Sequence, residues 1–110
     1  MPEQKPVQEW RTKLVGVSFS DRQELIKEYV ANGQRLFFKH NYQNQFDPNA
    51  IEIYVDAQGS KMIGHVNKKM AAHIVARKNE GFDHIFFCER VTGETKGGNL
   101  GVNIRIIARK

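Results

Sequence analysis

Short segments in which apolar and polar residues alternate constrain the fold of this chain more than any other feature. Alternation with a period of two is typical of strands that bury one face. The clearest example contains Ile51, Ile53 and Val55, each separated by one residue. Strands are predicted over residues 13–19, 35–40, 50–55, 61–66, 84–91 and 101–108. In the first of these, Val15, Val17 and Phe19 are expected on one face.

Two segments have the periodicity of helices instead. Ser20 and Gln23 form a capping-box pattern that predicts a helix start, and Asn32-Gly33 supplies a helix stop. Residues 67–81 carry an apolar stripe at helical spacing and end at a glycine. Short strands with few helices in 110 residues predict a mainly β (α+β) fold, a small barrel of about six strands.

Composition and length indicate a single folded unit. The chain is 40% hydrophobic and 10% aromatic, which is too apolar for a disordered chain, and 110 residues leave room for one core. Pro2 and Pro6 interrupt the polar start of the chain. We therefore expect a flexible N-terminal arm over residues 1–11 and a β-barrel domain over residues 12–110.

Several classes of protein and site are disfavoured. No apolar run approaches the roughly 18 residues of a membrane helix, and the start lacks the apolar run of a signal peptide, so a cytoplasmic protein is expected. Cys88 is the only cysteine, and its position within a predicted strand favours a buried residue over a nucleophile. The sequence has no P-loop and no histidine spacing typical of a metal site. We expect no enzymatic activity, cofactor or metal.

The positive charge is concentrated in the second half of the chain. The formal net charge of +5 comes from residues 56–110, because basic and acidic residues balance in residues 1–55. Such an excess suits a polyanion such as nucleic acid, although it is also common as an aid to solubility.

The densest unusual segment is the predicted loop of residues 41–51, which combines amides, aromatic rings and Asp47. Loops between strands commonly carry binding groups on a rigid scaffold. The alternative is a plain turn, in which Asp47 caps local amides and Phe46 packs against the barrel.

Three segments of the chain resemble one known family in order and spacing. They are Val15-Gly16-Val17, the run from Asn44 to Ile51, and Ile63-Gly64-His65-Val66 before a helix that contains Ala71-Ala72. Together they resemble the HIRAN domain, found in certain Swi/Snf-type ATPases and as a small stand-alone protein in bacteria and phages. The resemblance covers residues 14–108 and implies an OB-like or SH3-like barrel with two helices that captures the 3′ end of single-stranded DNA.

The resemblance also implies roles for individual residues. Phe46 and Phe19 match positions whose rings stack on the terminal base, and Asp47 matches the acidic residue that accepts from the free 3′ hydroxyl. Asn44 matches the amide that helps to position the hydroxyl, and His65 matches a position that contacts terminal phosphates.

Further phosphate contacts are expected from lysines. Lys68 matches another phosphate-contacting position of the family, and Lys61 and Lys69 are expected with it near the start of the second helix. The chain departs from the family pattern at Ser18, where a DNA-end-binding member has arginine, and at Gln45, where proline is usual.

Two functions from different classes follow. The first is a non-enzymatic domain, acting in DNA repair, that binds the 3′ end of single-stranded DNA. The second is a protein-interaction module whose loop and Trp10 arm dock a DNA-processing enzyme. A nuclease would need a partner for Asp47, such as Glu52 or Asp56.

Overall fold

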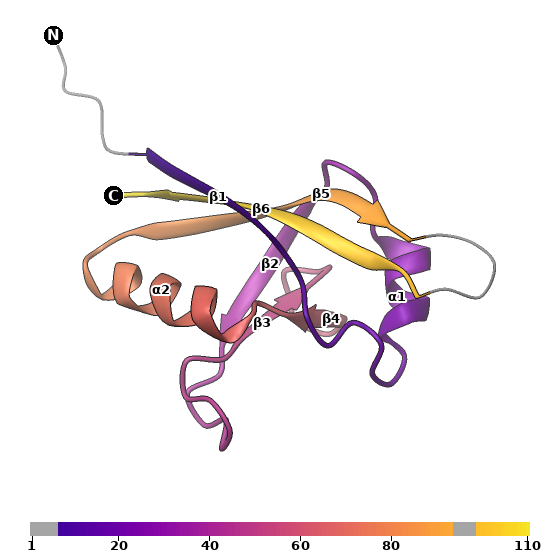
Figure 1. Cartoon of the computed structure of the whole chain (residues 1–110), viewed down its shortest axis with the longest axis horizontal. Coiled ribbons are helices and arrows are strands. Elements are labelled where there is room, and N and C mark those ends of the chain that lie inside the picture. Colours follow the sequence, from indigo (N-terminus) through magenta and orange to yellow (C-terminus); the bar gives the residue numbers. More distant parts are fainter. Residues whose placement is uncertain (1–6, 94–98) are drawn as a thin grey trace, which may run out of the picture.

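The structure, a computed structural model, describes residues 7–93 and 99–110. Residues 1–6 of the expected arm and residues 94–98 of the last loop lie outside the described residues. Six strands and two helices follow one another along the chain (Figure 1). In order they are β1 (Val7–Lys13), α1 (Arg22–Tyr29), β2 (Arg35–His40), β3 (Ile51–Tyr54), β4 (Met62–His65), α2 (Lys68–Asn79), β5 (Asp83–Thr92) and β6 (Gly101–Arg109).

The strands form one antiparallel sheet in the order β1-β6-β5-β2-β3-β4. The sheet curls until β4 meets the chain that leaves β1. There, the amide of Val15 donates to the carbonyl of His65 and the amide of His65 donates to the carbonyl of Val15, both at 2.9 Å. This bridge joins the two edges, and the predicted mainly β fold with a small barrel and two helices is confirmed.

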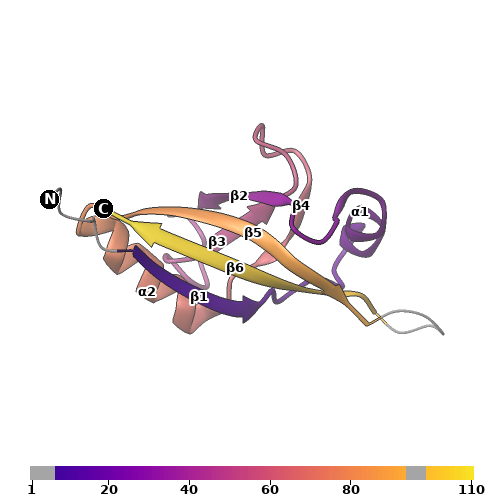
Figure 2. The ribbon, with the colours of Figure 1, turned by 90° about the horizontal axis from the view of Figure 1, so that it is seen from above.

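The core lies inside the curled sheet and is covered by the helices. Helix α2 lies along one side of the long strands and α1 lies at the far end (Figures 1 and 2). Each helix inserts apolar side chains, Ile26 from α1 and Ala71 and Ile74 from α2, all fully buried. Within the described part of the chain, neither helix has the length and apolar character needed to cross a membrane.

Residues 7–11, which the sequence placed in a flexible arm, belong to strand β1. The strand pairs with β6 along its whole length, from Val7 opposite Arg109 to Lys13 opposite Asn103. Its charged residues face outward and pair across the sheet, since Arg11 binds Glu89. An edge strand held by such pairs shows little apolar alternation, which is why the sequence did not reveal it.

The strand predicted over residues 13–19 is wrong apart from Lys13, which ends β1, and the bridge at Val15. Gly16 has φ +67° and Ser20, the residue after the segment, has φ +53°, so the chain turns within the segment and again at its end. Val15 and Phe19 are exposed and do not form an inward face.

The capping box predicted at Ser20 is also wrong. The N-cap of α1 is Asp21, and its side chain makes no capping hydrogen bond. Gln23 donates instead to the carbonyls of Val17 and Leu100, each at 2.9 Å, and accepts from the amide of Leu100 at 2.7 Å. This glutamine therefore ties α1 to the start of β6.

The second predicted helix is confirmed. Helix α2 begins after Asn67, whose side-chain oxygen accepts from the amide of Met70 at 2.9 Å. It ends before Gly81, which has φ +96°, a conformation that glycine adopts without steric cost.

Candidate nucleic-acid interface

The loop between β2 and β3 is held in shape by its own side chains. The Asn44 side-chain oxygen accepts from the amides of Phe46 and Asp47, at 2.8 and 2.9 Å. Asp47 Oδ1 accepts from the amide of Asn49 at 2.9 Å. Such bonds satisfy the backbone of a loop that has no sheet neighbours, so Asn44 has a clear structural role here.

Phe46 lies at the tip of this loop with 91% of its surface exposed. The alternative of a plain turn is therefore half correct: Asp47 caps a local amide, but Phe46 does not pack against the barrel. A bare phenyl ring beside a fixed carboxylate offers stacking and hydrogen-bond acceptance at neighbouring positions.

The base of the loop meets the start of α2. The amide of Val66 donates to the carbonyl of Ile51 at 3.0 Å, which places the end of β4 against the start of β3. Lys68, the first residue of α2, is exposed two residues further on. The structure thus brings the loop, His65 and Lys68 to one end of the short strands.

His65 stands beside Glu52, its cross-strand partner on β3. Burial and the Arg22 guanidinium lower the pKa of His65, and Glu52 opposes them in part. Glu52 accepts from Tyr54 at 2.7 Å and from Asn41 at 3.2 Å. Burial and the bond to Glu52 raise the pKa of Tyr54 to about 12. At neutral pH the site therefore presents a neutral imidazole next to a neutral phenol.

Phe19 lies on the other side of β4, near the start of α1, with 64% of its surface exposed. The Arg22 guanidinium lies 5.6 Å from the centre of the Phe19 ring and donates to the carbonyl of Gly16 at 2.6 Å. Sequence reasoning missed Arg22. No local pattern marks it, because its role depends on the turn at Gly16 and on β4.

A second feature missed by sequence is a hollow of about 380 Å³ at the start of the loop. The rings of His40 and Tyr42 meet there at 4.0 Å, and Tyr42 is largely exposed. Lys39 and Glu52 also line it, which connects it to His65 across the sheet. Polar groups and exposed rings thus continue from the loop onto the outer face of β3.

Two of the predicted lysines lie apart from this group. Lys61 was expected near the start of α2, but it lies before β4 with its ammonium group 5.4 Å from the centre of the Tyr29 ring of α1. Lys69 is exposed on α2 and lines a groove that contains Trp10.

The cysteine and the residue types that ligate metals remain to be placed. Cys88 is fully buried, and burial raises the pKa of its thiol. Within residues 7–93 and 99–110, no three His, Cys, Asp or Glu side chains gather as metal ligands would.

Comparison with known proteins identifies the family. The sequence pattern of the HIRAN domain matches residues 7–109. The chain belongs to the HIRAN domain family. HIRAN domains are a nucleic-acid-binding family. No curated protein matches the chain.

Two solved structures have the same fold. The crystal structure of the HIRAN domain of human HLTF is 16% identical, with a TM-score of 0.65 over 92% of this chain and 74% of that one. A crystal structure of a protein from Lactobacillus plantarum is 15% identical, with a TM-score of 0.65 over 94% of this chain and 98% of that one. At these identities the likeness concerns the fold.

Proposed function

We propose that this HIRAN domain binds single-stranded DNA without enzymatic activity and prefers a free 3′-hydroxyl end. The observation that carries the proposal is the exposed Phe46 ring next to the carboxylate of Asp47, which its own turn holds in place. The proposal includes a role in DNA repair in the cytoplasm, because repair produces free 3′ ends as intermediates.

The chemistry of these two residues favours an end over a continuous strand. Stacking a base on an aromatic ring contributes about 1 to 3 kcal/mol and tolerates any sequence. A free 3′ hydroxyl can donate to the Asp47 carboxylate, whereas a 3′ phosphate or a continuing backbone would place two anions in contact. His65 and Lys68, near the base of the loop, are suited to the phosphates that precede the terminal nucleotide.

A titration with labelled oligonucleotides tests this proposal. Three ligands of one sequence are compared: one with a 3′ hydroxyl, one with a 3′ phosphate, and one whose 3′ end is blocked so that only its 5′ end is accessible. We expect the tightest binding for the 3′ hydroxyl. Affinity should fall with salt by roughly 0.7 log units per log unit of salt for each phosphate neutralised.

Asp47→Asn is the decisive variant, because it keeps the shape and the oxygen that accepts from Asn49 and removes only the charge. The ratio of the affinities for the 3′-hydroxyl and the 3′-phosphate ligands should then approach one. Asp56→Asn is the matched control. Asp56 also caps its own turn, at Ser60, but lies in the hairpin between β3 and β4, so its loss should leave the preference unchanged.

Equal affinity of the unaltered protein for all three ligands would contradict end recognition. Absence of binding to any of them at low salt would favour the second function, docking of a DNA-processing enzyme. The observation in favour of that function is the groove at Trp10, whose lining is largely apolar.

A further inference from the structure

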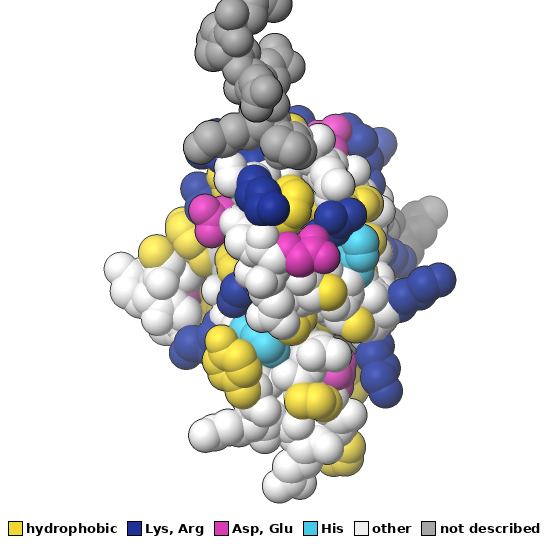
Figure 3. All heavy atoms as spheres, turned by 90° about the vertical axis from the view of Figure 1, so that its left-hand side faces the viewer, with side chains coloured by type: hydrophobic (Ala, Val, Ile, Leu, Met, Phe, Trp, Pro, Cys, Tyr) yellow, Lys and Arg dark blue, Asp and Glu magenta, His cyan; other side chains and the backbone are white. Residues whose placement is uncertain are grey.

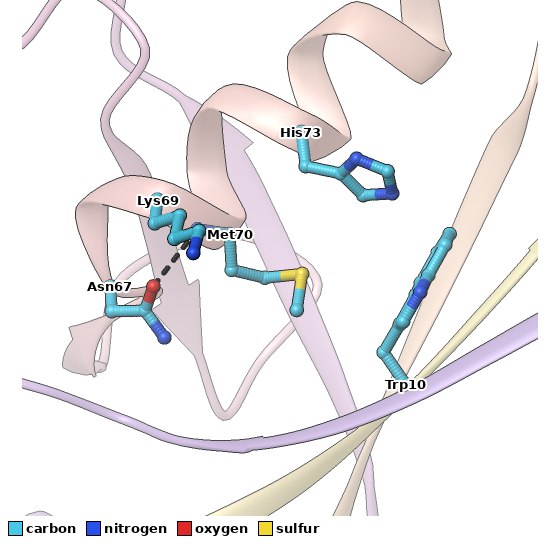
Figure 4. Close-up of a pocket in the computed structure, with 5 residues that line it drawn as sticks. All are labelled: Trp10, Asn67, Lys69, Met70 and His73. Atoms are coloured by element: carbon cyan, nitrogen blue, oxygen red, sulfur yellow. Dashed lines mark hydrogen bonds between the residues drawn. The ribbon is translucent and has the colours of Figure 1, made fainter.

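An open groove of about 450 Å³ runs between β1 and the first half of α2. Its lining combines aromatic, thioether and basic side chains and contains no acidic residue: Trp10, Asn67, Lys69, Met70 and His73. Figure 4 shows Met70 and His73 extending from α2 toward Trp10 on β1. The groove is separate from the loop that carries Phe46, because it opens on the β1 side of α2.

The tryptophan in this groove is held in a fixed orientation. The Trp10 ring meets the edge of His73 at 4.9 Å and lies nearly parallel to His84, with ring centres 6.3 Å apart. The Asn67 side-chain amide donates to the Thr12 hydroxyl at 2.9 Å and so links the start of α2 to β1. A ring that is already oriented loses little conformational entropy when a ligand stacks on it.

The groove adjoins the proposed DNA-end site at the first two residues of α2. Lys68 belongs to the end site and Lys69, the next residue, lines the groove, so their Cα atoms are about 3.8 Å apart. Figure 3 shows the end of the molecule where α2 finishes, and there Lys and Arg side chains dominate the charged groups. This charge lies beyond the groove, and a strand that passes from the end site to the groove meets the exposed Lys69 first.

We propose that this groove binds an unpaired base of the same DNA strand, on the 5′ side of its captured end. The inference rests on the proposed function. The base packs against the exposed part of the Trp10 indole, beside the Met70 thioether, and the Lys69 ammonium binds an adjoining phosphate. An exposed lysine beside an aromatic ring suits a nucleotide better than an apolar peptide, which would leave the ammonium group without a partner.

Trp10 is the only tryptophan of the chain, so its fluorescence reports directly on the groove. The probes are a thymidine dinucleotide and an oligothymidylate of about ten nucleotides, within the range of site sizes of OB folds, both with a free 3′ hydroxyl. We expect the longer probe to quench Trp10 as it binds. The dinucleotide should occupy the end site, as measured by competition against a labelled strand, and leave Trp10 fluorescence unchanged.

Two neighbouring surface lysines provide a matched pair of variants that does not threaten folding, since both are exposed. Lys69→Gln should weaken the longer probe about fivefold at 0.1 M salt, as expected for one lost phosphate contact, and leave the dinucleotide unaffected. Lys68→Gln should weaken both probes alike. Trp10→Phe should retain the length dependence, because the smaller ring still stacks.

Failure of this inference can be told apart from failure of the proposed function. If the longer probe binds with a 3′-hydroxyl preference but Trp10 fluorescence and the Lys69→Gln affinity do not change, the groove proposal is wrong and end recognition stands. If Trp10 is quenched but the 3′ hydroxyl confers no preference, the groove proposal stands alone. If neither probe binds, both proposals are overturned, and a protein becomes the better occupant of the groove.

Discussion

The charged side chains on the surface of the barrel have different partners in its two halves. On the outer surface of β1, β6 and β5, which we call the paired face, Arg11 binds Glu89 and Glu9 binds Arg105. On the outer surface of β2, β3 and β4 with α1, which we call the aromatic face, cations lie over rings. The pairs are Lys39 with Tyr54, Arg22 with Phe19, Arg35 with Phe37 and Lys61 with Tyr29.

This difference indicates which charged side chains are available to bind a phosphate. A cation paired with a carboxylate is largely neutralised for an incoming phosphate, whereas a cation over an aromatic ring keeps its full charge. The paired face belongs to the longest strands, whose inner sides supply Phe86, Ile104 and Ile106 to the core. The aromatic face belongs to shorter strands and adjoins the loop of Phe46. We infer that the paired face serves the stability of the fold and that the aromatic face serves the ligand.

The largest expected effect comes from two phenylalanines, one from each half. Phe86→Ala removes a ring that is 1% exposed and should lower the free energy of unfolding by about 3 to 5 kcal/mol. Phe46→Ala removes a ring that is 91% exposed and should change it by less than about 0.5 kcal/mol. Urea denaturation of both variants measures the difference.

The same two variants should rank in the opposite order for binding. Phe46→Ala should weaken single-stranded DNA about tenfold, and Phe86→Ala, at a temperature where it is folded, should leave affinity nearly unchanged. A strong loss of stability in Phe46→Ala would contradict the division between the halves, since it would mean that the loop contributes to the core.

His65 on the aromatic face is expected to give binding and stability opposite dependences on pH. Its pKa in the free protein is below the ordinary 6.5, so the folded chain binds fewer protons than the unfolded chain, and stability falls as pH drops below about 6.5. A phosphate beside the imidazole favours its charged form, since it acts with Glu52 and against Arg22. Binding should therefore take up a proton and strengthen as pH falls from about 8 to 6, by at most about tenfold per unit of pKa change.

His65→Gln is the variant that checks this assignment by anisotropy at several pH values. It should flatten the pH dependence of binding. It should remove only part of the pH dependence of stability, because burial also lowers the pKa of His84 and that residue remains. If the pH dependence of binding is unchanged in His65→Gln, a group other than His65 takes up the proton.

Local patterns were sufficient for the parts of the fold that alternate clearly. Strands β2, β3, β4, β5 and β6 and helix α2 lie within a few residues of their predicted positions, because each carries its own periodicity and its own turn residues. The turn at Gly16 and the role of Gln23 could not be predicted, since Gln23 is fixed by the backbone of Leu100, 77 residues away.

The candidate site was predictable in composition but not in arrangement. The exposed Phe46 and the capping Asp47 lie in the loop that its unusual residues indicated. The separation of Lys61 and Lys69 from that loop, and the position of Arg22 over Phe19, depend on how α1 packs against β4 and how the start of α2 lies beside β1. No spacing along the sequence carries that information.

The smallest effect is expected on the paired face, from Glu89→Gln. The Arg11 Nε lies 2.8 and 2.9 Å from the two carboxylate oxygens of Glu89, but both side chains are open to solvent. An exposed pair of this kind contributes about 0 to 1 kcal/mol, so the urea midpoint should move little. Affinity for single-stranded DNA should change by less than about twofold, and toward tighter binding, because Arg11 is released and one negative charge is lost. A clear loss of affinity would show that the paired face also contacts the ligand, and both outer faces would then contribute to binding.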